Sequence, residues 1–280
     1  MKMICDAKPK KRGGKSKGGG GGRRRGDGIA RQTATTDPLC PRKAQRVFDS
    51  MSVVQRSLES LTELASRQPE ILVSYSGGKD SLAVMEMCVK IFGASRVKAF
   101  FWYTVPDLEV CNKQMRFCRE RWGVDPVQIP HWDMVKCMAN GLWCDATPGL
   151  DDMPELDLKL GYAYALSVTG SQIVATGMKE ADGMPRRHFF ANIRDSGNPF
   201  WHRLVHPIRE WSKKDVIDYL KANSIPVPEA EKGAVTTGVG LVHDALCWLH
   251  DKHPEDFQKL LRWYPYAMAA IKRRDWFGVK

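Results

Sequence analysis

The order of apolar and polar residues along the chain predicts helices that alternate with short buried strands. Residues 42–67 repeat apolar side chains at steps of three and four, which is the period of an amphipathic helix, and Pro69 ends it. Apolar runs that predict buried strands follow at residues 71–75, 97–103, 126–129, 172–176 and 203–206. Helices are expected at residues 81–92, 108–122, 134–140, 158–168, 212–222, 242–251 and 255–263.

Strands that alternate with helices indicate a parallel sheet covered on both faces. We therefore expect an α/β fold with a doubly wound, mostly parallel five-stranded sheet, helices on both faces and a helical C-terminal extension. Right-handed crossovers would bring the carboxyl ends of the strands to one edge, where ligands bind in such folds. Residues 144–157 read as a loop, and residues 181–200, rich in Gly, Pro, Arg and Asn, are expected to form a long functional loop.

The charge of the chain is concentrated near its N-terminus. The 280 residues carry a formal net charge of +11, of which residues 1–31 contribute +9 and residues 32–280 only +2. The first stretch also contains nine of the 24 glycines and almost no large apolar residue, so we expect it to be disordered. The predicted division is a basic Gly-rich tail at 1–38, an α/β domain at 39–228 and a helical extension at 229–280.

Composition excludes several classes of protein for the body of the chain. The full chain is 43% hydrophobic, so the body can build a full core, and no run approaches the roughly 20 apolar residues of a membrane span. The first 30 residues lack the apolar segment of a secretory signal, and no two of the eight cysteines form a CxxC pair. These features lead us to expect a cytoplasmic protein with reduced thiols.

The stretch with the clearest chemistry is Ile71-Leu-Val-Ser-Tyr-Ser-Gly-Gly-Lys-Asp-Ser-Leu82, a buried strand followed by a tight turn and the start of a helix. Gly77 and Gly78 would let the backbone approach a ligand. The amides that follow would lie at a helix N-terminus, which favours an anion, and Lys79 adds a full positive charge.

Three further side chains complete this turn as a cradle for pyrophosphate. Ser76 and Ser81 can donate hydrogen bonds to phosphate oxygens, and Asp80 can cap the helix or help to hold a magnesium ion. The turn is not a Walker P-loop, because Asp80 stands where that motif needs Ser or Thr, and Val73 stands where it needs its first Gly.

The sequence SGGKDS after a buried strand resembles the PP-loop motif of the adenine-nucleotide α-hydrolase superfamily, and within it the phosphoadenosine-phosphosulfate (PAPS) reductase-like family. The resemblance covers about residues 70–225. It implies a doubly wound α/β fold that either cleaves ATP between the α and β phosphates or binds a sulfonucleotide in the same pocket.

Three more stretches are similar to that family in the same order. Phe100-Phe-Trp-Tyr-Thr104 lies where the family has an Asp-Thr-Gly-like turn, with Tyr103 and Val105 in place of the Asp and Gly. The segment 176–186 is similar to the family's Gly-x-Arg-x-x-Glu-Ser-x-x-Arg, and 206–216 to its Pro-x-x-x-Trp-x-x-x-Asp-Val. The nucleotide-binding residues that we predict are Ser74, Ser76, Gly77, Gly78, Lys79, Asp80, Ser81, Thr104, Gly177, Lys179, Arg186 and Arg187.

The predicted ligands are ATP, or PAPS in its place, with Mg²⁺, and Lys79, Asp80 and Ser81 are the predicted catalytic residues, with Asp80 as the metal ligand. Reductases of this family carry a nucleophilic Cys in a C-terminal Glu-Cys-Gly-Leu-His-like segment, and this chain has none there. The favoured reaction is therefore adenylyl transfer from ATP to an unknown acceptor in sulfur or nucleic-acid metabolism. Asp107 and Asp182 are the candidates for a general base.

Two other functions stay open at this stage. One is a sulfonucleotide reductase that uses an unrecognised Cys, such as Cys247. The other is a non-catalytic, nucleotide-sensing DNA-binding regulator, which the altered positions Tyr103 and Val105 motivate. The basic tail suits contact with nucleic-acid phosphates as well as it suits a solubilising role.

Two smaller features also have competing interpretations. His243, Cys247 and His250 share a helix face and could bind zinc, or they belong to an ordinary half-apolar helix. Trp211 is interpreted as a core residue rather than as a platform for substrate stacking.

Overall fold

The computed structural model describes residues 52–132, 134–149, 156–195, 199–227 and 240–278. The predicted basic tail and residues 42–51 of the first predicted helix lie outside these ranges. The strands are β1 (Ile71–Ser74), β2 (Val97–Tyr103), β3 (Val127–Pro130), β4 (Val174–Ala175) and β5 (Leu204–Val205). The α-helices are α2 (Val53–Arg67), α3 (Lys79–Phe92), α4 (Glu109–Trp122), α5 (Met134–Ala139), α6 (Leu158–Thr169), α7 (Met184–Asp195), α8 (Lys213–Ala222), α10 (His243–Lys252), α11 (Pro254–Trp263) and α12 (Met268–Phe277).

The five strands form one parallel sheet in the order β3-β2-β1-β4-β5. β1 lies at its centre, with Val73 paired to Ala99 of β2 on one side and to Ala175 of β4 on the other. The chain winds outward from β1 to β3 and then crosses back to β4, so the winding reverses between β1 and β4. This confirms the predicted doubly wound α/β fold, and it places a topological switch point at the carboxyl ends of β1 and β4.

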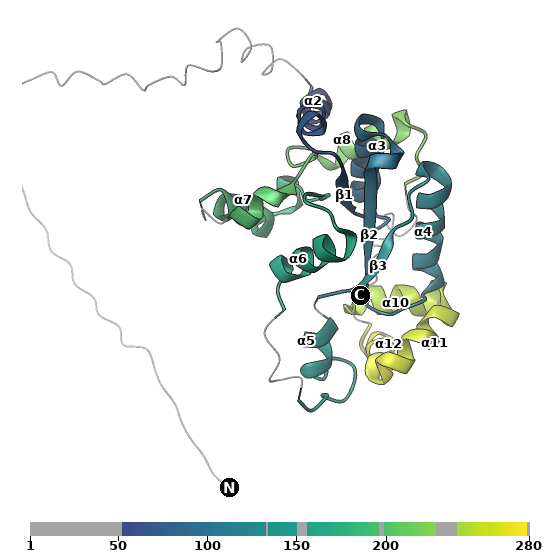
Figure 1. Cartoon of the computed structure of the whole chain (residues 1–280). Coiled ribbons are helices and arrows are strands. Elements are labelled where there is room, and N and C mark those ends of the chain that lie inside the picture. Colours follow the sequence, from purple (N-terminus) through teal and green to yellow (C-terminus); the bar gives the residue numbers. More distant parts are fainter. Residues whose placement is uncertain (1–51, 133, 150–155, 196–198, 228–239, 279–280) are drawn as a thin grey trace, which may run out of the picture. The chain divides into compact units, whose positions relative to one another are not determined.

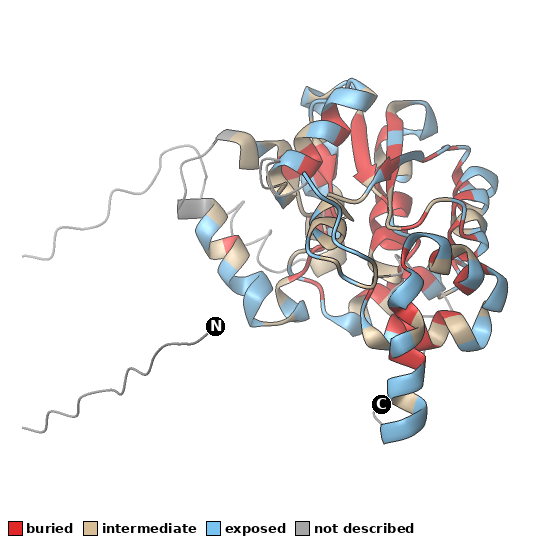
Figure 2. Ribbon diagram, turned by 90° about the horizontal axis from the view of Figure 1, so that it is seen from below, coloured by how far each residue is buried: buried red, intermediate tan, exposed pale blue. Residues whose placement is uncertain are grey.

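The sheet is covered on both faces, as its alternating side chains require (Figure 1). Ile71 and Val73 belong to a large core that also includes side chains of α3, α4 and α8. Leu72 points to the opposite face, where it packs in a smaller core with Tyr162 and Leu166 of α6. Figure 2 shows these buried strands and helix faces in the centre of the body.

The C-terminal helices share the larger core with the sheet. Phe257 and Leu260 of α11 are fully buried there. The N-cap of α4 is Leu108, which cannot cap a helix with its side chain, and Asp256 of α11 supplies this function. Its carboxylate accepts from the amides of Glu109 and Val110 at 2.8 Å each. The predicted boundary at 228–229 adjoins residues outside the described part and stays a prediction.

The prediction of a long loop over residues 181–200 is wrong. Residues 184–195 form helix α7, preceded by a 3-10 turn at Glu180–Asp182 and followed by another at Pro199–Arg203. The Gly and Pro residues that indicated a loop lie at the boundaries of the helix, where Pro at an N-terminal position is compatible with helical backbone. Between them, Phe190 is buried and anchors the helix to the body.

Three smaller expectations can be compared with the structure. The six cysteines within the described ranges form no disulfide. Helix α8 begins with the predicted capping box of Ser212 and Asp215. Among the described residues, none of the helices combines the length and hydropathy that a membrane crossing requires.

Candidate functional site

The turn from β1 to α3 lies at the topological switch point, and it is held by the hydroxyl of Ser81. That hydroxyl donates to the carbonyl oxygen of Gly78 at 2.9 Å and accepts from the amide of Ser76 at 3.2 Å. Gly78 is the N-cap of α3 and has no side chain, so no side-chain hydrogen bond caps the first turn. The backbone of this turn can thus present N–H groups to an anion.

Gly77 is required by a neighbouring side chain as well as by its backbone. Its φ of +72° is left-handed, and a Cβ built on it would lie 2.6 Å from Cγ of Gln114 in α4. The Tyr75 hydroxyl in turn donates to the carbonyl oxygen of Gln114 at 3.0 Å. Gln114 therefore packs directly on the turn, and the sequence pattern gave no signal of it.

Two lysines converge on Asp80 in the first turn of α3. Nζ of Lys79 lies 3.0 Å from Oδ2 and Nζ of Lys179 lies 2.6 Å from Oδ1. Lys179 is only 1% exposed, and its Nζ also lies 2.9 Å from Oδ1 of Asp182. These four charges form one network that fixes the two ammonium groups beside the turn.

The segment after β4 approaches the start of α3 closely enough to exclude a side chain. A Cβ on Gly177 would lie 3.1 Å from the carbonyl carbon of Asp80 and 3.2 Å from the amide nitrogen of Ser81. This close approach is the physical reason for a glycine between Thr176 and Met178. It also brings Lys179 within reach of Asp80.

A cavity of about 360 Å³ adjoins the turn at the carboxyl edge of the sheet. Residues at the carboxyl ends of three neighbouring strands line this cavity. Ser74 ends β1 and Ser76 lies two residues beyond it, Thr104 directly follows β2, and His131 directly follows β3. The remaining wall is formed by Tyr75, Trp102, Met134, Cys137, Leu142, Gly240, Leu241 and Val242. It is a largely apolar pocket with a few polar groups, which is the usual composition of a small-molecule site.

Other predicted residues lie around this centre with different degrees of contact. Tyr162 hydrogen-bonds Ser74, and burial raises the pKa of its hydroxyl to about 12. Arg186 of α7 reaches Met178, with its Nη1 2.9 Å from the sulfur. Arg187 is exposed and donates to the carbonyl oxygen of Glu180 at 3.3 Å, and within the described part of the chain its side chain makes no hydrogen bond or ion pair with the turn.

His206 carries a half-buried imidazole that the sequence did not single out as a site residue. Its Nδ1 lies 2.6 Å from the hydroxyl of Thr176, and its ring packs edge-to-face on Phe190 at 4.9 Å. Burial, reinforced by the positive charges of Arg209 and Arg186, lowers the pKa of His206 to about 4. The ring is therefore neutral at physiological pH.

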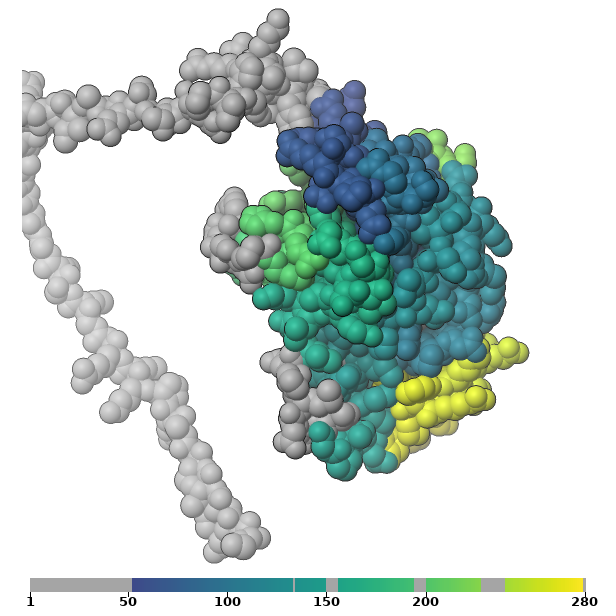
Figure 3. Space-filling view, in the orientation of Figure 1, coloured from purple at the N-terminus to yellow at the C-terminus, as the bar shows by residue number. Residues whose placement is uncertain are grey.

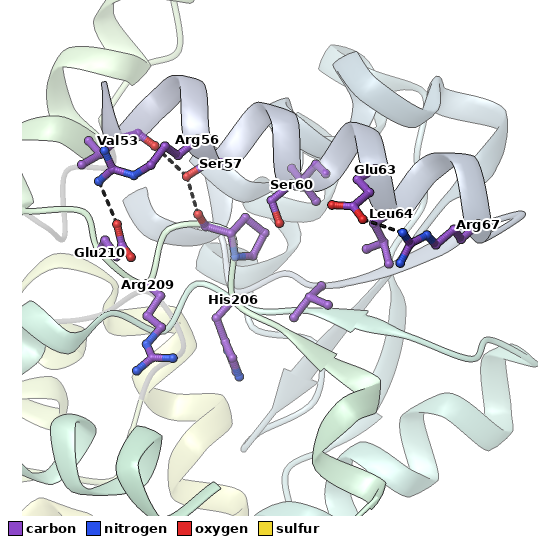
Figure 4. Close-up of a pocket in the computed structure, with 13 residues that line it drawn as sticks. Val53, Arg56, Ser57, Ser60, Glu63, Leu64, Arg67, His206, Arg209 and Glu210 are labelled. Atoms are coloured by element: carbon purple, nitrogen blue, oxygen red, sulfur yellow. Dashed lines mark hydrogen bonds and ion pairs between the residues drawn. The ribbon is translucent and has the colours of Figure 1, made fainter. Parts of the chain in front are cut away.

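A second cavity, of about 400 Å³, lies between α2 and the segment 205–210 (Figure 4). Four of its charged side chains are paired with one another, Arg56 with Glu210 at 2.8 Å and Arg67 with Glu63 at 2.6 Å, and Arg209 pairs with Glu180 outside the cavity at 2.6 Å. His206 borders it but points away from α2 in Figure 4. With its charges neutralised in this way, this cavity is the weaker candidate for a ligand.

The structure also bears on the remaining alternatives. Within the described part of the chain, no three His, Cys, Asp or Glu side chains are grouped to hold a metal ion. The ring of His250 instead packs edge-to-face on Phe257 at 5.1 Å. Trp211 is fully buried and donates to the hydroxyl of Ser57 at 2.9 Å, as expected of a core residue.

Asp107 lies away from the network of Asp80 and is an unfavourable general base. Its side chain is 78% exposed and lies 3.6 Å from Nζ of Lys259. The hydrogen bond from Asn112, together with the charge of Lys259, holds the pKa of its carboxyl below the usual value.

Most of the additional residues lie far in sequence from the turn. Gln114 packs on Gly77, Tyr162 hydrogen-bonds Ser74 at the end of β1, and Leu241 lines the adjoining cavity. They come from three separate helices or their flanks, and only the folded chain brings them together. The position of His131 could have been found from the sequence, because it follows a predicted strand just as Thr104 does.

The sequence matches no protein-family model and no curated protein at a significant level. Among solved structures, an NH3-dependent NAD synthetase from Campylobacter jejuni, in complex with the nitrate ion, aligns with 82% of this chain and 98% of its own. The two share 12% identity with a TM-score of 0.45, and a likeness at this score carries no conclusion about what the present chain binds.

Proposed function

We propose that this chain is a PP-loop enzyme that binds ATP at the carboxyl edge of its sheet and cleaves it between the α and β phosphates. The observation that carries the proposal is the cavity lined by Ser74, Ser76 and Thr104, because it adjoins a helix start with two lysines beside it. The specific resemblance to the PAPS reductase-like family belongs to this proposal and rests on the motifs of the sequence.

We assign the adenosine to the cavity and the phosphates to the first turn of α3. The apolar walls and the rings of Trp102 and His131, whose centroids are 5.5 Å apart, suit a base, and the hydroxyl of Thr104 suits its polar edge. Uncapped amides and the ammonium group of Lys79 suit an anion of high charge.

The reaction that we propose is in-line attack of an acceptor on the α phosphorus. The acceptor forms a bond to that phosphorus and loses its proton to solvent water, and the bond to the bridging oxygen breaks, so that pyrophosphate departs with the electron pair. Lys79 would offset the charge that develops on pyrophosphate, and Lys179 would hold Asp80 and thereby position Lys79. Neither Asp107 nor Asp182 is assigned as the base.

Magnesium accompanies ATP in this proposal, with Asp80 as the predicted ligand. Both oxygens of Asp80 contact ammonium groups in this structure, so a metal ion at this carboxylate would replace one of those contacts. No step of the reaction is therefore routed through the metal.

A second candidate is the sulfonucleotide reductase, and it is favoured by one observation. Cys137, rather than Cys247, lines the cavity, so a thiol faces the space in which the nucleotide would lie. Formation of sulfite from PAPS with a thiol donor, lost in Cys137→Ser but kept in Cys144→Ser, would select this function instead.

Two cysteines allow a direct test of where ATP binds. Cys137 lines the cavity and Cys144 does not, although both are partly exposed. ATP should slow the alkylation of Cys137 and leave that of Cys144 unchanged, as measured by mass spectrometry of the labelled peptides. Equal rates at Cys137 with and without ATP would contradict the assigned site.

The bond that is cleaved is tested by the products. Wild type with magnesium and candidate acceptors should release AMP and pyrophosphate, and Lys79→Ala should abolish the release while Lys213→Ala, an exposed lysine on α8, should not. Release of ADP and phosphate would overturn the proposed chemistry. ATP binding with no turnover would favour the regulator that senses nucleotide.

A further inference from the structure

The last two helices present a surface that is both aromatic and basic, and it lies outside the nucleotide site. We call it the aromatic–basic surface. Its exposed members within the described residues are Arg262, Trp263, Tyr266, Lys272, Arg273, Trp276 and Phe277. Trp276 and Phe277 are 76% and 72% exposed, which is unusual for side chains that large. These helices form the yellow part of the space-filling view in Figure 3.

Helix α12 places two cations around one of the indoles. Ala270 and Ile271 are buried against the body, and Lys272 and Arg273 stand four and three residues before Trp276. Residues at these spacings are neighbours on the surface of a helix, so both cations flank the indole on the outer face. Figure 2 shows the last turn of this helix exposed and extending away from the body.

The cations of this surface are not neutralised by the protein. Within the described part of the chain, the side chains of Arg262, Lys272 and Arg273 make no ion pair and no hydrogen bond. Arg274, on the inner side of α12, contrasts with them, because it pairs with Asp251 at 2.7 Å and with Asp275 at 3.2 Å. Residues 259–280 contain six basic side chains and one acidic one, so the local field is strongly positive.

The aromatic rings are likewise available to a partner. Trp263, Trp276 and Phe277 stack on no other ring among the described residues, whereas buried rings such as Trp211 do. An apolar protein partner would cover the rings but would have to desolvate the unpaired cations beside them. A chain of phosphates and bases satisfies both kinds of group at once, by ion pairing and by stacking.

We propose that the aromatic–basic surface binds single-stranded nucleic acid through phosphates and base faces. The inference is independent of the proposed ATP site. The basic N-terminal segment would have a different role in binding. Residues 1–31 carry +9 without any Trp, Tyr or Phe, so they can supply charge but no aromatic stacking.

The test measures binding of the full chain to a fluorescent oligodeoxythymidine of about 20 nucleotides by anisotropy. The double variant Trp276→Ala/Phe277→Ala should bind about tenfold more weakly than wild type, and should keep its affinity for inorganic polyphosphate, which has charge but no bases. Unchanged affinity of this variant for the oligonucleotide would overturn the proposal.

The cations are tested separately by salt dependence. Lys272→Gln/Arg273→Gln should reduce the slope of log affinity against log salt by about 1.4, or 0.7 for each lost phosphate contact. The matched control, Lys213→Gln/Lys221→Gln, removes two exposed lysines of α8 and should leave the slope and the affinity unchanged. Equal effects of the two pairs would contradict a defined surface.

Two further outcomes would also reject the proposal. Equal affinity for the oligonucleotide and for its duplex would show that stacking on unpaired bases does not contribute. A wild-type dimer that Trp276→Ala/Phe277→Ala converts to monomers in sedimentation would identify the surface as a contact between two copies of the chain. Circular dichroism of each variant confirms its fold, and these positions are exposed enough to tolerate substitution.

Discussion

Replacement of Lys179 by Met tests whether the buried ion network holds the candidate site together. The substitution keeps the aliphatic stem but removes the ammonium group that lies 2.6 Å from Asp80 and 2.9 Å from Asp182. Asp80 then keeps the ammonium group of Lys79, at 3.0 Å, and Asp182 loses the ammonium group that paired with it. The negative charges of the two carboxylates are then poorly balanced by positive charge. Water cannot easily replace the lost ammonium group, because Lys179 is only 1% exposed.

The magnitude follows from how far each partner is removed from water. Breaking a fully buried pair by deleting one partner costs about 3–5 kcal/mol, because the other charge stays buried. Here the side chains of Asp80 and Asp182 are 22% and 39% exposed, so water compensates part of the loss. We therefore expect the free energy of unfolding of Lys179→Met to fall by about 2 kcal/mol.

The chain offers a matched control in Lys214→Met. Lys214 also lies 2.6 Å from a carboxylate, that of Asp218, but the two side chains are 84% and 53% exposed. Exposed pairs of this kind contribute little to stability. Urea denaturation followed by far-ultraviolet circular dichroism should show a clear loss for Lys179→Met and almost none for Lys214→Met.

The reasoning is refuted if both variants lose the same stability. A second check is the double variant Asp182→Asn/Lys179→Met, which removes the carboxylate left without a partner as well as the lysine. It should be less destabilised than the two single variants added together, because residues in one ion network do not contribute independently.

Three other predictions follow from neighbouring features. Gly77→Ala should lower stability by about 1–2 kcal/mol for its left-handed backbone alone and more through the clash with Gln114, so adding Gln114→Ala should recover part of the loss in the same denaturation assay. His206 has a pKa of about 4 in the folded protein against 6.5 in the unfolded chain, so between these pH values only the unfolded state binds the proton. The free energy of unfolding should therefore rise by about 3 kcal/mol from pH 4 to pH 6.5, and His206→Asn should flatten this rise in denaturation curves. The thiol of Cys118, whose pKa burial raises to about 12, should resist alkylation in the native protein while Cys144 reacts, and prompt labelling of Cys118 by mass spectrometry would contradict its burial.

The fold could be predicted because its signals are local. Strands of this sheet are short apolar runs such as 97–103, and glycines such as Gly93 and Gly123 mark the ends of the helices between them. The glycine and proline content of residues 181–200 predicts a loop, yet those residues stand at the borders of helix α7 and leave its interior helical. Position within a segment, rather than its composition, decides whether such residues break a helix.

The candidate site was predictable to the extent that it lies in one continuous turn. Residues 76–81 predict an anion cradle because the glycines, the lysine and the hydroxyl side chains that such a cradle needs follow one another along the chain. Gln114 and Tyr162 carry no such signal, since an amide or a phenol in an amphipathic helix has many uses. The role of Lys179 was indicated by resemblance, but its burial between Asp80 and Asp182 depends on the approach of two distant loops.

The cap that Asp256 places on α4 has a consequence for the order in which the protein matures during synthesis. Helix α4 carries Gln114, which packs on Gly77 in the turn, yet the carboxylate that caps this helix comes from α11, 147 residues after Glu109. The sheet and the turn leave the ribosome long before residue 256 does. We therefore expect nascent chains that lack α11 to form the sheet while the first turn of α4 stays frayed. The candidate site, against which α4 packs, would then become fully ordered only after α11 has been synthesised.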